Sequence, residues 1–324
     1  MHRLIRAGLA AALALSVSVP ALAADKWPSK PLTLVVPFGP GSSPDMMSRV
    51  IAEQASATLG QPIVVQNRPG ASGNLGTSVI AKSAADGYTF GVSITGPMVN
   101  NTVLYDTLPY DPKKDLSPLT LAVHQPNILV VPGDSPIKSI DDLLKVVRDP
   151  NSAYNFPSTG AGTVSHLAIE LLLERVGGKA VHVPYPSSPG AVTSLLSRDT
   201  HFSALPPIAV MPLINDGRLR PLAVVYSERM SFLPDVPTLA EQGVTGIEGS
   251  GWIGFVAPAG MPKDIKQTLT DALIGAIAHP DVQARLKAQF MEPVGSSSVE
   301  FANYMDEELQ RWEPVIKRLN LSVN

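Results

Sequence analysis

Short runs of β-branched residues alternate with longer stretches in which apolar residues recur at helical spacing. This pattern predicts strands at residues 32–38, 62–66, 88–94, 127–131, 154–156, 180–183 and 251–257. It predicts helices between them at 44–59, 74–84, 140–147, 164–176 and 191–197. Such alternation is typical of parallel sheets covered by helices. The last part of the chain differs, because residues 263–278, 281–290 and 299–319 predict helix after helix.

Two of the apolar strands, 127–131 and 251–257, have no obvious partner nearby in the sequence. We therefore expect the chain to leave a first lobe near the former strand and to return at the latter. The prediction is an α/β fold of two lobes with a double crossover, in which residues 24–130 plus 250–324 form one lobe and 131–249 the other. A cleft between two such lobes is expected to hold the ligand, because the lobes can close around it.

The N-terminal segment has the three parts of an export signal. Arg3 and Arg6 lie at the start of an apolar run at 4–19, and Ala21-Leu22-Ala23 gives a small-residue cleavage site. The apolar run is shorter than the roughly 20 residues that span a bilayer. We predict a signal peptide at 1–23, cleaved near Ala23, and a soluble mature protein in the periplasm.

Composition excludes several functions. The chain has no cysteine, which fits an oxidising compartment without disulfides and excludes a lipid-anchoring cysteine, thiol catalysis and thiolate metal sites. The formal net charge is −3 with no basic block, which argues against a nucleic-acid partner. Zinc-protease, P-loop and nucleophile-elbow motifs do not occur. No catalytic residue, metal or cofactor is predicted.

The strongest local feature is a glycine loop between the first predicted strand and helix. It runs Phe38-Gly39-Pro40-Gly41-Ser42-Ser43-Pro44-Asp45, with Ser43 expected as the N-cap and Pro44 as the first helical residue. Glycines let backbone N–H groups approach a ligand, and a helix N-terminus favours an anion. A well-capped turn without a ligand is the alternative. Asp45 could complement the helix dipole, or hold the loop or a water.

A second loop of the same kind precedes the predicted helix 164–176. It comprises Ser158, Thr159, Gly160, Gly162 and Thr163, with Thr163 expected as the cap. The two loops could face each other across the cleft and hold an anion with neutral donors. His166 in the following helix is more readily structural, and Tyr185 fits either cleft lining or packing. Thr95, Gly96 and Met98 end another strand, where Thr95 offers a hydroxyl.

Several ordered motifs resemble the Bug (TctC-like) receptors of tripartite tricarboxylate transporters. They include W-P-S-K-P-L-T-L-V-V-P-F at 27–38, Q-N-R-P-G-A-S-G-N-L-G at 66–76 and A-D-G-Y-T at 85–89. Further matches are G-A-G-T-V-S-H-L at 160–167, L-P-D-V-P-T at 233–238 and F-V-A-P-A-G at 255–260. The resemblance covers essentially the whole mature chain.

The resemblance implies a type II-like periplasmic binding protein that closes on a carboxylate. It places the ligand between the loop 38–45 with Thr95 and Gly96, and 158–163 with His166 and Tyr185 of the other lobe. The implied partners are the carboxylate and a two-component integral membrane permease, and we expect a monomer.

Two departures from the family pattern matter. The family loop usually has two consecutive glycines, whereas Gly41 is followed here by Ser42. Many members also carry an aspartate at the position of Ala204, which in some meets a ligand amine. Its absence favours a dicarboxylate or an aromatic carboxylate over an amino acid.

Two other functions compete with transport. One is a sensor whose closure signals to a membrane kinase. The other is a periplasmic hydrolase that uses Ser42 or Ser43, although no base accompanies either serine in a motif.

Overall fold

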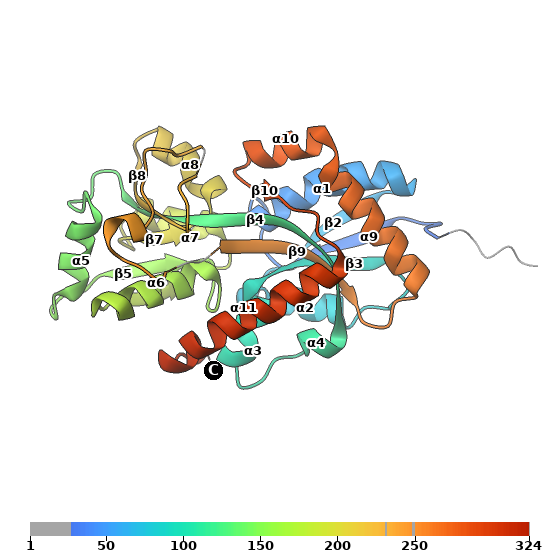
Figure 1. Ribbon diagram of the computed structural model, residues 1–324, viewed down its shortest axis with the longest axis horizontal. Helices are drawn as coiled ribbons and strands as arrows, with labels where there is room; N and C mark the ends of the chain where they lie inside the picture. The colour runs from blue at the N-terminus through green and yellow to red at the C-terminus, as the bar shows by residue number, and fades with distance from the viewer. Residues whose placement is uncertain (1–26, 231, 248–249, 324) are drawn as a thin grey trace, which may run out of the picture.

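The computed structural model describes residues 27–230, 232–247 and 250–323. The predicted signal peptide at 1–23 lies outside the described residues. The chain forms two α/β lobes that lie side by side, and the strands β4 (Leu116–Pro132) and β9 (Ser250–Pro258) run along the middle of the molecule (Figure 1).

The first lobe is built on a mixed sheet with the strand order β10-β4-β9-β3-β1-β2. The strands β1 (Leu32–Val36), β2 (Ile63–Asn67) and β3 (Thr89–Ile94) pair in parallel, as the alternation with helices predicts. The strands β9, β4 and β10 (Glu292–Pro293) add antiparallel pairs. The helices of this lobe are α1 (Ser43–Leu59), α2 (Asn74–Ala81), α3 (Asn101–Leu104), α4 (Pro112–Asp115), α9 (Lys263–Ala278), α10 (Pro280–Ala288) and most of α11 (Ser298–Arg318).

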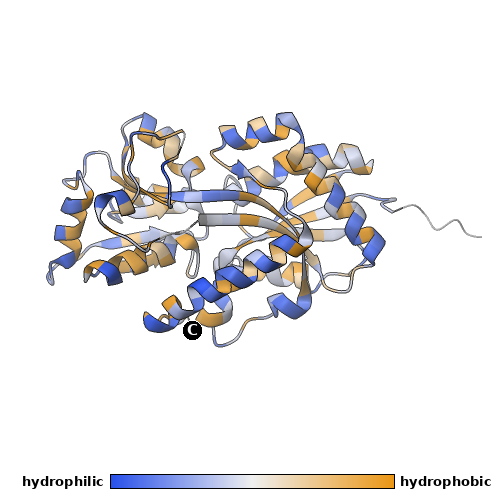
Figure 2. Ribbon diagram, viewed as in Figure 1, coloured by the Kyte–Doolittle hydropathy of each residue, from blue (hydrophilic) through white to orange (hydrophobic). Residues whose placement is uncertain are grey.

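The second lobe contains two smaller strand groups with helices against them. β7 (Ser203–Leu205) and β8 (Leu219–Val225) pair with the end of β4, and β5 (Asn155–Ser158) pairs in parallel with β6 (Val181–Pro184). Its helices are α5 (Ile140–Arg148), α6 (Val164–Val176), α7 (Ser188–Leu196) and α8 (Pro207–Asn215). The buried residues of α5 that pack in the core of this lobe are Ile140, Leu143, Leu144 and Val147, and hydrophilic residues lie between them along the helix (Figure 2).

The strand β4 passes from one lobe to the other. Its pairing with β9 ends at Pro126, and its pairing with β8 begins at Asn127. Proline has no N–H to donate to a sheet ladder, so it suits the point where a strand changes partners. This accounts for the two predicted strands without local partners: 251–257 pairs with the first part of β4, and 127–131 pairs with β7 and β8 of the second lobe. The lobe limits at 130 and 250 stay a prediction.

Several elements differ from the sequence predictions. The first eleven residues of β4 were not predicted, because Pro118 and Pro126 interrupt the apolar pattern. β7, α8 and β8 were also missed, since β7 is short and α8 contains Pro212. The predicted N-cap Ser43 is wrong by one residue: Ser42 is the N-cap and α1 begins at Ser43.

The chain packs into cores on both sides of the crossover. In the first lobe, buried residues of β1, β3 and β9 pack against α1 and α9, with Phe90 and Phe255 at the centre. In the second lobe, Phe156 and Phe202 are fully buried among residues of α5 and α6. Within the described ranges no helix is long and apolar enough to span a membrane.

Candidate functional site

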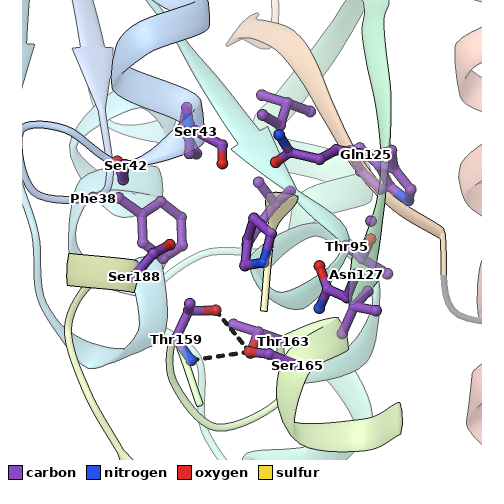
Figure 3. A pocket seen from close by; sticks show the side chains of 17 residues that line it. Phe38, Ser42, Ser43, Thr95, Gln125, Asn127, Thr159, Thr163, Ser165 and Ser188 are labelled. Atoms are coloured by element: carbon purple, nitrogen blue, oxygen red, sulfur yellow. Dashed lines mark hydrogen bonds between the residues drawn. The ribbon is translucent and has the colours of Figure 1, made fainter. Parts of the chain in front are cut away.

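A pocket lies where the two lobes meet at the crossover strands (Figure 3). The empty space between its walls is about 550 Å³, a volume that includes space open to solvent. Both lobes and the crossover strands contribute lining residues. They are Phe38, Ser42, Ser43, Pro44, Ile94, Thr95, Gln125, Asn127, Thr159, Thr163, Val164, Ser165, Ser188, Pro206, Gly251, Trp252 and Ile253.

The glycine loop forms the first-lobe wall of this pocket. Ser42 turns its hydroxyl back into the loop and donates to the carbonyl of Gly39 at 2.7 Å. Gly41 has a φ of 77°, a left-handed conformation that glycine adopts at little cost. The loop thereby presents the start of α1 to the pocket rather than covering it with a side-chain cap.

Asp45 holds this loop in shape. Its Oδ2 accepts from the N–H of Gly41 at 2.9 Å, and its Oδ1 accepts from Asn67 Nδ2 and Arg49 Nε, each at 3.0 Å. Burial of Asp45 opposes ionisation, but the hydrogen bonds from Arg49, Gly41 and Asn67 outweigh it and hold the pKa of the carboxyl below its usual range. Asp45 does not line the pocket, so it braces the site as an anion.

The second-lobe wall is a cluster of hydroxyls at the start of α6. Ser165 Oγ accepts from the N–H of Thr159 at 2.9 Å and lies 2.9 Å from the hydroxyls of both Thr159 and Thr163. Thr163 also donates to the carbonyl of Gly160 at 2.7 Å. These bonds fix the three side chains at the pocket, as Figure 3 shows.

Four helices point their N-termini at the pocket. The lining includes residues 42–44 at the start of α1, 163–165 at α6, Ser188 at α7 and Pro206 at α8. None of the four starts carries a side-chain cap hydrogen bond. Serines elsewhere do cap: Ser139 and Ser297 accept from backbone N–H groups at α5 and α11. Uncapped first turns leave backbone N–H groups available where the residue is not proline, as at Ser43, Val164 and Ser188, whereas α8 has prolines at its N-cap and first position. The helix dipoles add partial positive charge.

The pocket also holds polar side-chain atoms that are buried without a partner in the described part of the protein. They include Ser43 Oγ, Thr95 Oγ1 and Gln125 Nε2. Gln125 lies on β4 just before the change of partners, and Thr95 follows β3. A buried polar group without a partner costs stability, so its presence in a pocket indicates that a ligand can supply the missing bond.

None of the described residues lining the pocket carries a charged side chain. Phe38, Ile94, Val164, Trp252 and Ile253 add apolar surface between the polar groups. The arrangement can therefore bind an anion through neutral donors and helix ends, and it can pack an apolar body. No carboxylate of the described lining could pair with an amine group of a ligand. The pocket also offers the serines no base, because Ser42 donates to Gly39 and Ser43 has no partner in the described ranges.

Of the residues expected at the site, Phe38, Ser42, Ser43, Thr95, Thr159 and Thr163 line the pocket. The predicted glycines of the two loops, Gly39, Gly41, Gly160 and Gly162, are not among the lining residues. Gly96 packs against Gly162. Ser158 ends β5, where its hydroxyl accepts from the N–H of Gly160 at 3.0 Å.

His166, Met98 and Tyr185 lie outside the pocket lining. His166 Nδ1 accepts from the N–H of Gly162 at 3.1 Å, and its ring stacks on that of His182 with the centroids 3.8 Å apart. Its role in the described structure is to support the second loop. Met98 packs in a separate first-lobe core with Val99, and Tyr185 packs against the second-lobe core near α7.

Ala204, predicted as a ligand position, lies apart from the pocket lining. Its side chain is fully buried in the core of the second lobe and is not among the residues that line the pocket. Its carbonyl accepts from Asn127 Nδ2 at 3.1 Å and so orients a residue that does line the pocket. The argument against an amino-acid ligand therefore rests on the uncharged lining and not on Ala204.

Sequence reasoning missed Gln125, Asn127, Ser165, Ser188 and Pro206. Gln125 and Asn127 flank the proline of a strand whose first part was not recognised. Ser188 begins α7, which the sequence pattern predicted to start at residue 191. Pro206 precedes α8, which was not predicted. A polar pair around a proline at the end of an apolar run was the available signal for the first two.

Comparison with known proteins agrees with this geometry. The model of the tripartite tricarboxylate transporter family receptors (TctC) matches residues 47–321. A protein of Pseudomonas sp. (strain P51), described as lying in the tcbD-tcbE intergenic region, is 36% identical over all of this chain and 96% of its own length. BugT of Bordetella pertussis is 34% identical over 91% of both chains.

Solved structures show the same architecture. The R. palustris protein Rpa4515 with adipate superposes with a TM-score of 0.88 at 34% identity, covering 91% of this chain and 99% of that one. MatC of Rhodopseudomonas palustris with bound malate gives 0.85 at 30% identity, over 90% and 100% of the two chains. The periplasmic binding protein BugD gives 0.86 at 29%, over 91% and 99%. Family and neighbours are solute-binding proteins and not enzymes. The chain belongs to the tripartite tricarboxylate transporter family receptors.

Proposed function

We propose that this protein is a periplasmic receptor that binds a small organic carboxylate between its lobes. The observation that carries the proposal is the convergence of four uncapped helix N-termini on a pocket whose described lining has no charged side chain. Backbone N–H groups and hydroxyls then supply all donors to the anion. This arrangement stabilises a carboxylate without burying a counter-charge, which costs free energy when the site is empty.

The ligand class that fits best is a dicarboxylate or an aromatic carboxylate. Apolar side chains lie between the donors of α1 and those of α6, so a carbon chain or ring can pack there while its acid groups meet the helix ends. The adipate and malate bound by two similar proteins have such a form. An amino acid fits less well, because its ammonium group would lose water and gain no carboxylate partner.

We propose further that the lobes close on the ligand and that the closed receptor delivers it to a two-component integral membrane permease. A ligand that bridges α1 and α6 interacts with both lobes only when they meet, so it shifts the population toward the closed form. We expect the exported protein to begin near Ala24, after cleavage at Ala23, and to act as a monomer. Intact-mass analysis of protein from the periplasm tests the cleavage site.

A thermal-shift screen tests the ligand class. The screen compares mono-, di- and tricarboxylic acids, aromatic acids, amino acids and amines at matched concentrations. Stabilisation rises with the logarithm of concentration over the dissociation constant, so the shifts rank the ligands. We expect dicarboxylates or aromatic acids to give the largest shifts. Larger shifts with amines or with aspartate than with any simple acid would overturn the proposal.

A further inference from the structure

The two lobes also touch directly, beside the pocket, along a seam of backbone and amide groups. On the first lobe the seam consists of Ser72 and the segment 96–104, which begins with a π-helical turn (Gly96–Asn100) and continues as α3. On the second lobe it consists of the loop 160–162 before α6. A π-helical turn is rare and often marks a functional position.

The seam is so close that no side chain fits between the lobes. A Cβ added to Gly160 would lie 2.7 Å from Ser72 Oγ, and one added to Gly162 would collide with the Asn101 amide. Gly96 faces Gly162, and a Cβ added to Gly96 would lie 3.4 Å from the carbonyl oxygen of Gly162, which is a tight contact. The glycines of the second loop therefore allow the lobes to meet here.

One hydrogen bond joins the lobes across this seam. Asn100 Nδ2 donates to the carbonyl of Gly162 at 2.8 Å, and both residues are buried. The oxygens Asn100 Oδ1 and Asn101 Oδ1 are buried beside it with no partner in the described ranges. Separation of the lobes would expose all these groups to water. Closing thus gains one bond and leaves two buried amide oxygens unpaired, so the seam by itself does not favour closure.

We propose that Asn100 is a positioning residue that makes closure of the lobes possible while leaving it dependent on ligand. Without its amide, the Gly162 carbonyl would also be buried without a partner whenever the lobes meet. Asn100 does not line the pocket, so it acts through the loop that carries Thr163 and Ser165. This inference rests on the closure described under the proposed function, and it assigns a residue to that closure.

The chain offers a direct probe of closure. Gly39 of the first lobe faces Ser187 of the second, and a Cβ on Gly39 would lie 3.6 Å from Ser187 Cβ. This separation falls in the range of about 3.5–4.5 Å found in disulfides. The protein has no other cysteine. A Gly39→Cys/Ser187→Cys variant therefore traps the closed form, and its oxidation rate without ligand reports how often the lobes meet.

The test compares the trapping rate of the double-cysteine parent with the rates of three variants made in it. We expect Asn100→Ala to slow trapping about tenfold and Asn100→Asp to slow it further, because a carboxylate would face the Gly162 carbonyl. Thr102→Ala is the matched control: Thr102 donates to Val99 at 2.6 Å inside the same lobe, and its loss should change the rate less than about twofold. Asn100→Asp keeps the side-chain volume, which separates the effect from cavity formation.

Equal trapping rates in the parent and both Asn100 variants would overturn the inference, as would equal slowing by Thr102→Ala. Trapping needs no ligand. A failure of the carboxylate screen would therefore leave this result standing, and a failure here would leave the ligand class untouched.

Discussion

Asp45 Oδ2 accepts a hydrogen bond from the backbone N–H of Gly41 at 2.9 Å, which ties the glycine loop to the first turn of α1. Both partners lie in a single βα connection, yet the residues of this connection that line the pocket are their neighbours Phe38, Ser42, Ser43 and Pro44. The carboxylate thus shapes a binding site that it does not line.

Replacing Asp45 with Asn should lower the free energy of unfolding by about 2 kcal/mol, because buried hydrogen bonds to a charged acceptor are lost or weakened. Urea denaturation at neutral pH measures the change. Asp141→Asn provides the control, since Asp141 is an exposed aspartate in the first turn of α5 and its replacement should shift stability by less than about 0.5 kcal/mol. Equal effects of the two variants would contradict the bracing role.

The same carboxylate should contribute to acid sensitivity. Its folded-state pKa is held below the usual value of 3.8 by the bonds from Arg49, Gly41 and Asn67, against the opposing effect of burial. The stabilisation is therefore present above pH 3.8 and is lost as the pH falls through the folded-state pKa. Asp45→Asn should reduce the stability difference between pH 6 and pH 3. An unchanged stability difference would show that these hydrogen bonds do not lower the pKa of Asp45.

His182 should make the protein less stable in mild acid. Burial, and then the neighbouring His166, lower the pKa of His182 to about 3, against a usual value of 6.5. The unfolded chain binds the proton more readily, so stability falls as the pH drops from 6.5 toward 3, by up to about 1.4 kcal/mol per pH unit. His182→Gln should flatten this slope between pH 6.5 and 5, as followed by denaturant unfolding.

The Ser158→Ala variant tests whether the contact with Ser158, rather than burial, lowers the pKa of His182. Ser158 Oγ lies 2.6 Å from His182 Nε2, but burial and His166 are what lower the pKa of the imidazole. We expect this variant to keep the wild-type slope. A slope flattened equally by both substitutions would assign the effect to the hydrogen bond instead.

Thr95→Val should weaken ligand binding without destabilising the protein. Thr95 Oγ1 is buried with no partner in the described part of the chain, so a methyl group in its place should leave stability unchanged or raise it by up to about 1 kcal/mol. The bound ligand would lose a donor, which should raise its dissociation constant about tenfold. Thr270→Val is the matched control, because Thr270 Oγ1 is also buried without a described partner but lies in α9, away from the pocket. It should leave affinity unchanged; equal loss in both variants would contradict a ligand contact at Thr95.

The βα alternation and the two glycine loops could be predicted from sequence because both are local signals. Helices α6 and α9 begin and end where their apolar spacing indicates, and Thr163 is the N-cap. The first helix begins one residue earlier than predicted, because Ser42 and Ser43 are the same capping residue type and the sequence does not distinguish between them.

The rest of the site depends on long-range pairing. Gln125 and Asn127 reach the pocket because β4 changes partners between β9 and β8, strands more than ninety residues away. Ala204 looked like a ligand position from the family pattern, yet its side chain packs in a core because of its register against Leu129. Neither register is encoded in a local pattern of residues.

Calorimetric titration of the best acid from the screen, beside its primary amide, tests the central claim most directly. The amide has nearly the same shape and no negative charge. If uncapped helix ends and neutral donors bind an anion, the acid should bind at least about a hundredfold more tightly than the amide at neutral pH. Equal affinities, or tighter binding of the amide, would contradict the account.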